Sequence, residues 1–161
     1  MIHVVLVEPE IPPNTGNIAR TCAATGVSLH LVEPLGFSLD DRYLKRAGLD
    51  YWKDLNLHIH RDITALFAHM DSLGEPVLPP ALLTTRGEMM YTDIVPPVRQ
   101  EELFLLFGPE TRGLSDGLLA DHPGRRYRIP MLPHRRSLNL SNSVAIVVYG
   151  LLQKQNFPEM I

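Results

Sequence analysis

Small hydroxyl and amide side chains crowd one short segment of this chain, Ser137-Leu138-Asn139-Leu140-Ser141-Asn142, just before a long apolar run. The first turn of a helix leaves several backbone N–H groups without partners, so such side chains either cap the helix or share those donors with a ligand. Capping needs one residue of this kind, and the segment offers several. On this segment alone, the capping interpretation and the ligand interpretation both stay open.

A second polar segment, 108–113, follows the most apolar run of the chain, 103–107. Its two glycines permit backbone conformations that other residues disfavour, and Pro109 restricts the turn. We therefore expect this loop to hold Glu110 and Arg112 in defined directions. The alternative is an ordinary turn with a surface Glu–Arg pair, which stabilises a protein little.

In a third segment, 8–20, the consecutive prolines Pro12 and Pro13 stiffen the approach to a helix that we expect Asn14 or Thr15 to cap. At about 100° per residue, Asn17 and Arg20 share the polar side of this helix. Arg20 therefore projects from the first turns of the helix. The alternative is a solvated arginine on a surface helix.

Apolar runs that predict strands alternate along the chain with segments that predict helices, which indicates an α/β fold with a mostly parallel sheet flanked by helices. The expected strands are 2–7, 28–32, 57–60, 81–84, 103–107 and 127–129. The expected helices are 15–25, 40–47, 63–72, 114–120 and one that begins near Asn139. Because ligands of parallel sheets bind beyond the carboxyl ends of the strands, the three polar segments fall where a site is expected.

Composition limits the class of protein. With 161 residues and 45% hydrophobic content, we expect residues 1–161 to form a single domain. A net charge of -3 argues against coating nucleic acid by bulk charge but allows a local basic patch. No basic leader is present, and no apolar stretch reaches the roughly 18 residues that span a bilayer, so we expect a soluble, cytoplasmic protein with no membrane partner. The single cysteine, Cys22, is expected in the core.

Several common chemistries lack their sequence signatures. Neither G-x-G-x-x-G nor G-x-x-x-x-G-K-[ST] occurs, which disfavours nicotinamide cofactors and nucleoside triphosphates. No H-E-x-x-H or cysteine pair accompanies the histidines, so no metal is expected. Without a G-x-S-x-G elbow, hydrolase chemistry is disfavoured as well.

Basic side chains gather around the last predicted strand and the loop after it. They are Arg125, Arg126, Arg128, His134, Arg135 and Arg136, and a second group consists of Arg42, Lys45 and Arg46. Such clusters grip the phosphates of a nucleic acid. The alternative is a solvated basic face.

Taken together and in this order, the motifs Asn14-x-Gly16-Asn17-x-x-Arg20, Gly108-Pro109-Glu110-x-Arg112-Gly113 and Ser137-Leu138-Asn139-Leu140-Ser141-Asn142 resemble those of the SPOUT methyltransferases. The resemblance spans nearly the whole chain. It is closest to the minimal tRNA (cytidine/uridine-2'-O)-methyltransferases of the wobble nucleotide, because segments 8–17 and 46–51 match that subgroup as well.

This resemblance implies a C-terminal deep trefoil knot, a homodimer, and S-adenosyl-L-methionine as methyl donor, with S-adenosyl-L-homocysteine as product. General rules of chain topology would not predict a knot, so only the resemblance carries that expectation. By the same resemblance, the cofactor would be held by Leu83, Gly108, Ile129, Met131, Ser137 and Leu138. The reactive site would comprise Asn14, Arg20, Glu110, Ser137 and Asn139, and the tRNA would be bound by Arg46, Arg112, Arg135 and Arg136.

The implied reaction is attack of a ribose 2'-oxygen on a sulfonium methyl group, in which positioning dominates catalysis. A guanidinium stays protonated, so we assign Arg20 to orienting ribose or phosphate rather than to proton abstraction. Glu110 is either the base or a holder of Asn14 and the loop. The apolar helix after Asn142 is covered either by a second subunit or within one subunit.

Three alternatives stay open at this point. The substrate nucleotide could be another position of tRNA or a position of rRNA. The chain could instead be a non-catalytic RNA-binding module with the same fold. A nucleotide-using metabolic enzyme is the third alternative, although the missing phosphate loops disfavour it.

Overall fold

The computed structural model describes residues 1–39, 55–74, 76–158 and 160–161. Its centre is a seven-stranded sheet in the order β3-β2-β1-β6-β4-β7-β5, and every strand pair is parallel. The strands are β1 (Ile2–Val7), β2 (Ser28–Val32), β3 (Leu57–His60), β4 (Ala81–Leu83), β5 (Met89–Met90), β6 (Leu103–Phe107) and β7 (Arg126–Arg128). The predicted α/β class and the parallel sheet are confirmed.

The central strands are buried on both faces, which explains their continuous apolar sequences. All five residues of β2 and all five of β6 are buried. The register pairs Leu6, the residue before the end of β1, with Phe107 at the end of β6. The loops that follow these two strands therefore leave the sheet side by side, at the same edge.

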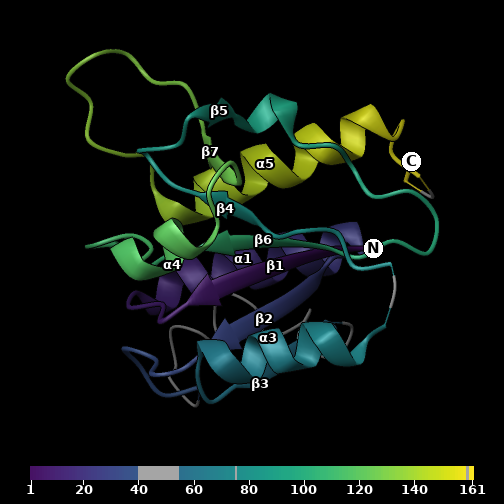
Figure 1. Cartoon of the computed structure of the whole chain (residues 1–161), viewed down its shortest axis with the longest axis horizontal. Helices are drawn as coiled ribbons and strands as arrows, with labels where there is room; N and C mark the ends of the chain where they lie inside the picture. Colours follow the sequence, from purple (N-terminus) through teal and green to yellow (C-terminus); the bar gives the residue numbers. More distant parts are fainter. Residues whose placement is uncertain (40–54, 75, 159) are drawn as a thin grey trace.

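Helices cover both faces of the sheet (Figure 1). The helices α1 (Pro12–Thr25) and α5 (Leu140–Lys154) pack on each other and on one face, where they contribute to the larger core cluster. The helices α3 (Ile63–Ser72) and α4 (Asp116–Asp121) contribute to the smaller cluster on the other face. Cys22 lies in the core as predicted, where burial raises the pKa of its thiol to about 12.

The start of α1 corrects one prediction. The helix begins at Pro12 rather than near residue 15, and its N-cap residue is Ile11, without a side-chain cap. Two prolines in the first turn start the helix because they need no N–H partner there and have the helical φ. Asn14 and Thr15 are therefore buried inside the helix, and the expectation that one of them caps it is wrong. The predicted stop at Gly26 is confirmed, with φ of 69°.

Other boundaries differ slightly from the predicted ones. β4 ends one residue earlier, β7 covers Arg126–Arg128 rather than 127–129, and α4 covers Asp116–Asp121 rather than 114–120. The two-residue strand β5 and the 3-10 helix η1 (Tyr91–Asp93) were not predicted, because elements so short have no periodicity to detect.

Some expectations fall on residues outside those that the structure describes. They are the helix 40–47, the motif 46–51, and the basic residues Arg42, Lys45 and Arg46. The trefoil knot stays a prediction. No helix in the described part of the chain has the length and apolarity that crossing a bilayer requires.

Candidate active site

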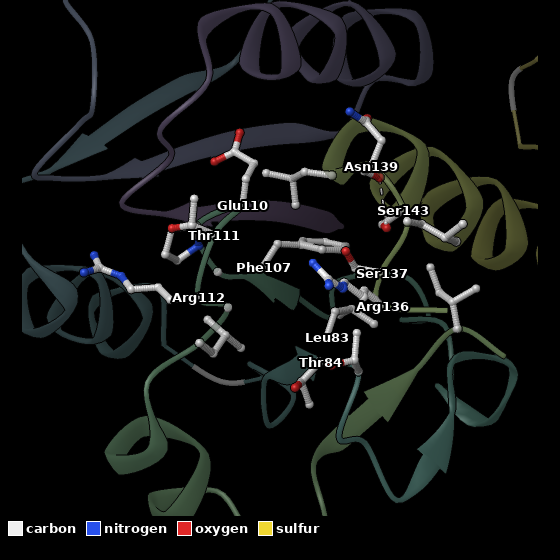
Figure 2. A pocket seen from close by; sticks show the side chains of 18 of the residues that line it. Leu83, Thr84, Phe107, Glu110, Thr111, Arg112, Arg136, Ser137, Asn139 and Ser143 are labelled. Atoms are coloured by element: carbon white, nitrogen blue, oxygen red, sulfur yellow. Dashed lines mark hydrogen bonds between the residues drawn. The ribbon is translucent and has the colours of Figure 1, made fainter. Parts of the chain in front are cut away.

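A cavity of about 530 Å³ lies beyond the carboxyl ends of β6, β4 and β7, three neighbouring strands (Figure 2). Its volume is in the range of small-molecule sites. The wall combines apolar side chains, among them Leu83, Phe107 and Ile129, with polar groups of two loops, 108–113 and 136–139. Polar segments that are far apart in the sequence therefore meet at one edge of the sheet.

The loop 108–113 folds tightly back on itself. A Cβ atom on Gly108 would lie 2.2 Å from the carbonyl carbon of Gly113 and 2.2 Å from the nitrogen of Leu114. The N–H of Gly113 donates to the carbonyl of Pro109 at 2.9 Å, and Gly113 has a φ of 70°. The shape of the loop thus requires both glycines, because a side chain has no room at Gly108 and would be strained at the positive φ of Gly113.

Glu110 ties this loop to the start of α1. Its Oε2 accepts a hydrogen bond from the N–H of Glu10 at 2.9 Å. Its Oε1 accepts from the N–H of Ile11 at 3.2 Å and from Nδ2 of Asn14 at 3.0 Å. With both oxygens engaged by donors, the geometry supports the holding role of Glu110 rather than that of a base.

The carboxylate of Glu110 does not pair with Arg112, so the ordinary surface turn does not describe this loop. Arg112 instead makes an ion pair with Glu8 across the two loops. Figure 2 shows Arg112 pointing away from the other labelled side chains. Phe107, Arg136 and Ser137 all line the cavity.

Asn14 continues the network to the start of α5. Its Oδ1 accepts from Nδ2 of Asn139 at 2.9 Å, while Oδ1 of Asn139 accepts from the N–H of Ser141 at 2.9 Å and of Asn142 at 3.3 Å. Asn139 is therefore the N-cap of α5, as its position predicts, and also a partner of Asn14. The capping interpretation of this segment is therefore confirmed for Asn139, and the ligand interpretation stays a prediction.

Most of the predicted site residues line the same cavity. They are Asn14, Leu83, Gly108, Glu110, Arg112, Ile129, Met131, Arg136, Ser137, Leu138 and Asn139. Arg20 and Arg135 do not line it, although both are exposed. Arg20 lies six residues after Asn14 on α1, which places it roughly 9 Å further along the axis and on another side of the helix. Arg46 lies outside the described residues.

One segment of the wall was not predicted from the sequence: Thr84-Thr85-Arg86, which follows β4 directly. The signal was present, since two threonines and an arginine come after a buried apolar strand. Arg86 makes an ion pair with Asp116 at 2.6 Å. Within the part of the chain that the structure describes, no group of three or more metal-binding side chains is arranged around a common point.

Comparison with known proteins agrees with this geometry. Residues 1–149 match the model of the SpoU rRNA Methylase family. The chain is 47% identical over 158 residues to a tRNA (cytidine(34)-2'-O)-methyltransferase of Methylovorus glucosotrophus, with 98% of this chain and 97% of the relative covered. The corresponding Escherichia coli enzyme is 45% identical over 161 residues, with 98% and 96% covered.

A solved structure described as "Structural insights into the 2-OH methylation of C/U34 on tRNA" superposes with a TM-score of 0.87 at 41% identity, and 97% of each chain is covered. The order of the three motifs, the cavity that they build and the match over nearly the whole length all agree. The chain belongs to the SpoU rRNA Methylase family.

Proposed function

We propose that the protein transfers a methyl group from S-adenosyl-L-methionine to the ribose 2'-oxygen of nucleotide 34, cytidine or uridine, in the anticodon loop of tRNA. The observation that carries this proposal is the hydrogen-bonded series Glu110–Asn14–Asn139, which joins all three motifs at the edge of one cavity. Relatives that are 45% to 47% identical over nearly the full length are named tRNA (cytidine(34)-2'-O)-methyltransferases, which supports it.

The cavity suits an adenosyl sulfonium compound, because it offers apolar side chains together with the backbone of a glycine-restricted loop. Residues assigned to the cofactor are Leu83, Gly108, Ile129, Met131, Ser137 and Leu138. When bound, S-adenosylmethionine supplies the methyl group and leaves as S-adenosylhomocysteine. No metal is assigned a role, so activity is expected to persist in EDTA.

The polar residues of the site position the ribose. Asn139 and Asn14 are held rigidly by each other and by Glu110, so their amides have fixed directions. Ser137 takes part in none of the hydrogen bonds found in the described part of the chain, so its hydroxyl is available to the ribose. Arg20 orients phosphate or ribose as a permanent cation.

The tRNA is bound by Arg112 and Arg136 at the cavity and by Arg135 beside it, together with Arg46. A basic group of this kind supplies affinity through phosphate contacts even on a chain of net charge -3. Because its proposed substrate is tRNA, we also assign the protein to the cytoplasm.

We also assign a homodimer. Five residues of α5 are buried, but Ile146 and Tyr149 stay 36% and 43% exposed on the same helix. This helix packs beside α1, so a second subunit on its exposed face would lie next to the helix that carries Arg20. That arrangement gives a role to an arginine that does not line the cavity of its own subunit.

The decisive experiment incubates the protein with unmodified tRNA and methyl-labelled S-adenosylmethionine, followed by nucleoside mapping. We expect label on the 2'-oxygen of nucleotide 34, none on a matched tRNA with 2'-deoxyribose at that position, and a large loss of rate in Arg20→Ala. Label on a base, or transfer to another nucleotide only, would refute the assigned reaction.

The family name favours a second substrate class, ribosomal RNA. The same assay with unmodified rRNA fragments tests it directly. RNA binding without any transfer would instead identify a non-catalytic binding module.

A further inference from the structure

We propose that Glu10, a residue that does not line the cavity, is a positioning residue for the donor-binding loop and acts on it through Thr111. The inference rests on the proposed function only in identifying the ligand of the cavity. Its structural basis is a set of reciprocal contacts between loops 8–14 and 108–113, here called the clasp. The clasp consists of the carboxylates of Glu10 and Glu110 with their donors on Thr111, Glu10 and Ile11.

In one direction, Glu10 binds the loop 108–113. Its Oε2 accepts from the N–H of Thr111 at 3.1 Å and from Oγ1 of Thr111 at 2.8 Å, and its Oε1 lies 2.9 Å from the same hydroxyl. Both donors of one residue therefore meet one carboxylate. Such a two-point contact determines the orientation of Thr111 as well as its place.

In the other direction, Glu110 binds the loop 8–14. It accepts from the N–H of Glu10 and of Ile11, and from Nδ2 of Asn14. Glu110 and Thr111 are consecutive, so two neighbouring residues of one loop are attached to the other loop through opposite donor and acceptor roles. Movement of Glu10 would consequently disturb both Thr111 and the carboxylate that holds Asn14.

A third loop, which contains Gly36, packs against the backbone of Glu10. The N–H of Gly36 donates to the carbonyl of Pro9 at 2.9 Å. A Cβ atom on Gly36 would lie 2.8 Å from Cα of Glu10, so the two backbones pack as closely as glycine allows. This loop thus holds the backbone of Glu10 in place, so the carboxylate projects toward Thr111 from a fixed position.

The clasp lies at the wall of the cavity, and Glu10 is the one clasp residue that does not contribute to that wall. Its other members, Thr111, Glu110 and Ile11, line the cavity. Glu10 therefore has no contact with a ligand there, and its effect on binding passes through the shape of the loop. Because the contact is charge-assisted but partly exposed, its loss is expected to change the affinity for the donor roughly tenfold.

The test compares four variants: Glu10→Ala, Glu10→Gln, Thr111→Val and Thr111→Ser. Calorimetric titration with S-adenosylmethionine is expected to give a dissociation constant roughly tenfold higher for Glu10→Ala, and a smaller increase for Thr111→Val, in which the N–H of residue 111 still donates to Glu10. Thr111→Ser keeps the hydroxyl, and Glu10→Gln keeps one acceptor oxygen, so both should bind more tightly than their matched partners. The double variant Glu10→Ala with Thr111→Val should be no worse than Glu10→Ala alone, because Glu10→Ala already removes the contact to the Thr111 hydroxyl together with the contact to its N–H.

A second measurement needs no ligand. Hydrogen exchange of the Thr111 amide should become faster in Glu10→Ala, while the melting temperature changes little and the KM for tRNA stays at the wild-type value. Wild-type protein that fails to bind S-adenosylmethionine would refute the proposed function, and the exchange rate would still decide on the clasp. Unchanged exchange at Thr111, or additive losses of affinity in the double variant, would overturn the inference. If Glu10→Ala fails to fold, the Thr111→Val and Thr111→Ser pair decides by the same titration.

Discussion

Mild acid is expected to destabilise this protein through a chain of buried imidazoles. Nε2 of His3 lies 2.8 Å from a carboxylate oxygen of Glu102, Nδ1 of His3 lies 2.9 Å from Nε2 of His30, and Nδ1 of His30 lies 2.9 Å from Nε2 of His60. Because a carboxylate only accepts, a neutral His3 donates through Nε2 and accepts through Nδ1. The same assignment extends along the chain of imidazoles, so the neutral rings of His30 and His60 also carry their protons on Nε2.

An additional proton does not fit at the centre of this chain. His30 is fully buried, and a second N–H on its ring would face the N–H of His60. Burial, followed by the neighbouring His3, His58, His60 and His69, lowers the pKa of His30 to about 2. Burial also lowers the pKa of His3 and of His60. For Glu102, burial opposes ionisation, but hydrogen bonds from His3 and the terminal ammonium outweigh it and lower the pKa.

The sign and size of the effect follow from proton linkage. At pH values below the ordinary histidine pKa of 6.5, His30 binds a proton in the unfolded chain but stays neutral in the folded protein. The free energy of unfolding therefore falls as the pH falls. The contribution of His30 is intact above pH 6.5 and is lost progressively toward pH 2. At pH 5, His30 alone lowers stability by about 2 kcal/mol, a sizeable part of the roughly 5–15 kcal/mol typical of a domain.

The assay is urea unfolding at constant ionic strength between about pH 7.5 and pH 5, a window that lies above the range in which carboxylates titrate. At pH 7.5 we expect His30→Leu to be less stable than the wild type, since His3 and His60 lose a partner. Below roughly pH 6 its free energy of unfolding should depend less steeply on pH, with a slope smaller by about 1.4 kcal/mol per pH unit. His134→Gln, in an exposed loop outside the chain of imidazoles, is the matched control. A wild-type stability that does not change over this window, or an unaltered slope in His30→Leu, would refute the reasoning.

Three further predictions concern the site. Gly108→Ala should abolish donor binding, because its Cβ would lie 2.2 Å from Gly113, whereas Gly117→Ala, with nothing within 4 Å, should bind normally in the same titration. Asn139→Ala should lower the free energy of unfolding by about 1 kcal/mol in urea, because the helix loses its cap. Asn139→Asp should keep the cap but lose methyl-transfer activity, because an aspartate has no N–H to donate to Asn14. Equal activity in the Asn139→Asp variant and the wild-type enzyme would contradict this. Replacing both Arg135 and Arg136 by Ala should flatten the linear fall of log tRNA affinity with log salt, and an unchanged slope would remove both from the RNA-binding surface.

Local sequence was sufficient for the sheet and for the edge of the sheet at which the polar loops and the cavity lie. Continuous apolar runs such as 103–107 predict strands buried on both faces, and such strands occur in parallel sheets. The carboxyl ends of these strands then indicate where polar loops meet. The cap of α5 at Asn139 and the stop of α1 at Gly26 were equally readable, because both depend on backbone groups within a few residues.

Partners far away in the chain could not be predicted in this way. Asn14 has the residue type of a cap, yet it bridges Glu110, 96 residues away, and Asn139, 125 residues away. The contact with Glu110 was one of two roles that the family resemblance had suggested, and the contact with Asn139 was not predicted. His58 and His60 were seen only as two histidines without a metal pattern, and the imidazole chain appears only when β1, β2 and β3 lie side by side. Backbone conformation is dictated mainly by near neighbours, whereas the partner of a buried polar side chain depends on strand order and register. The clasp and the imidazole chain were therefore decided by tertiary structure alone.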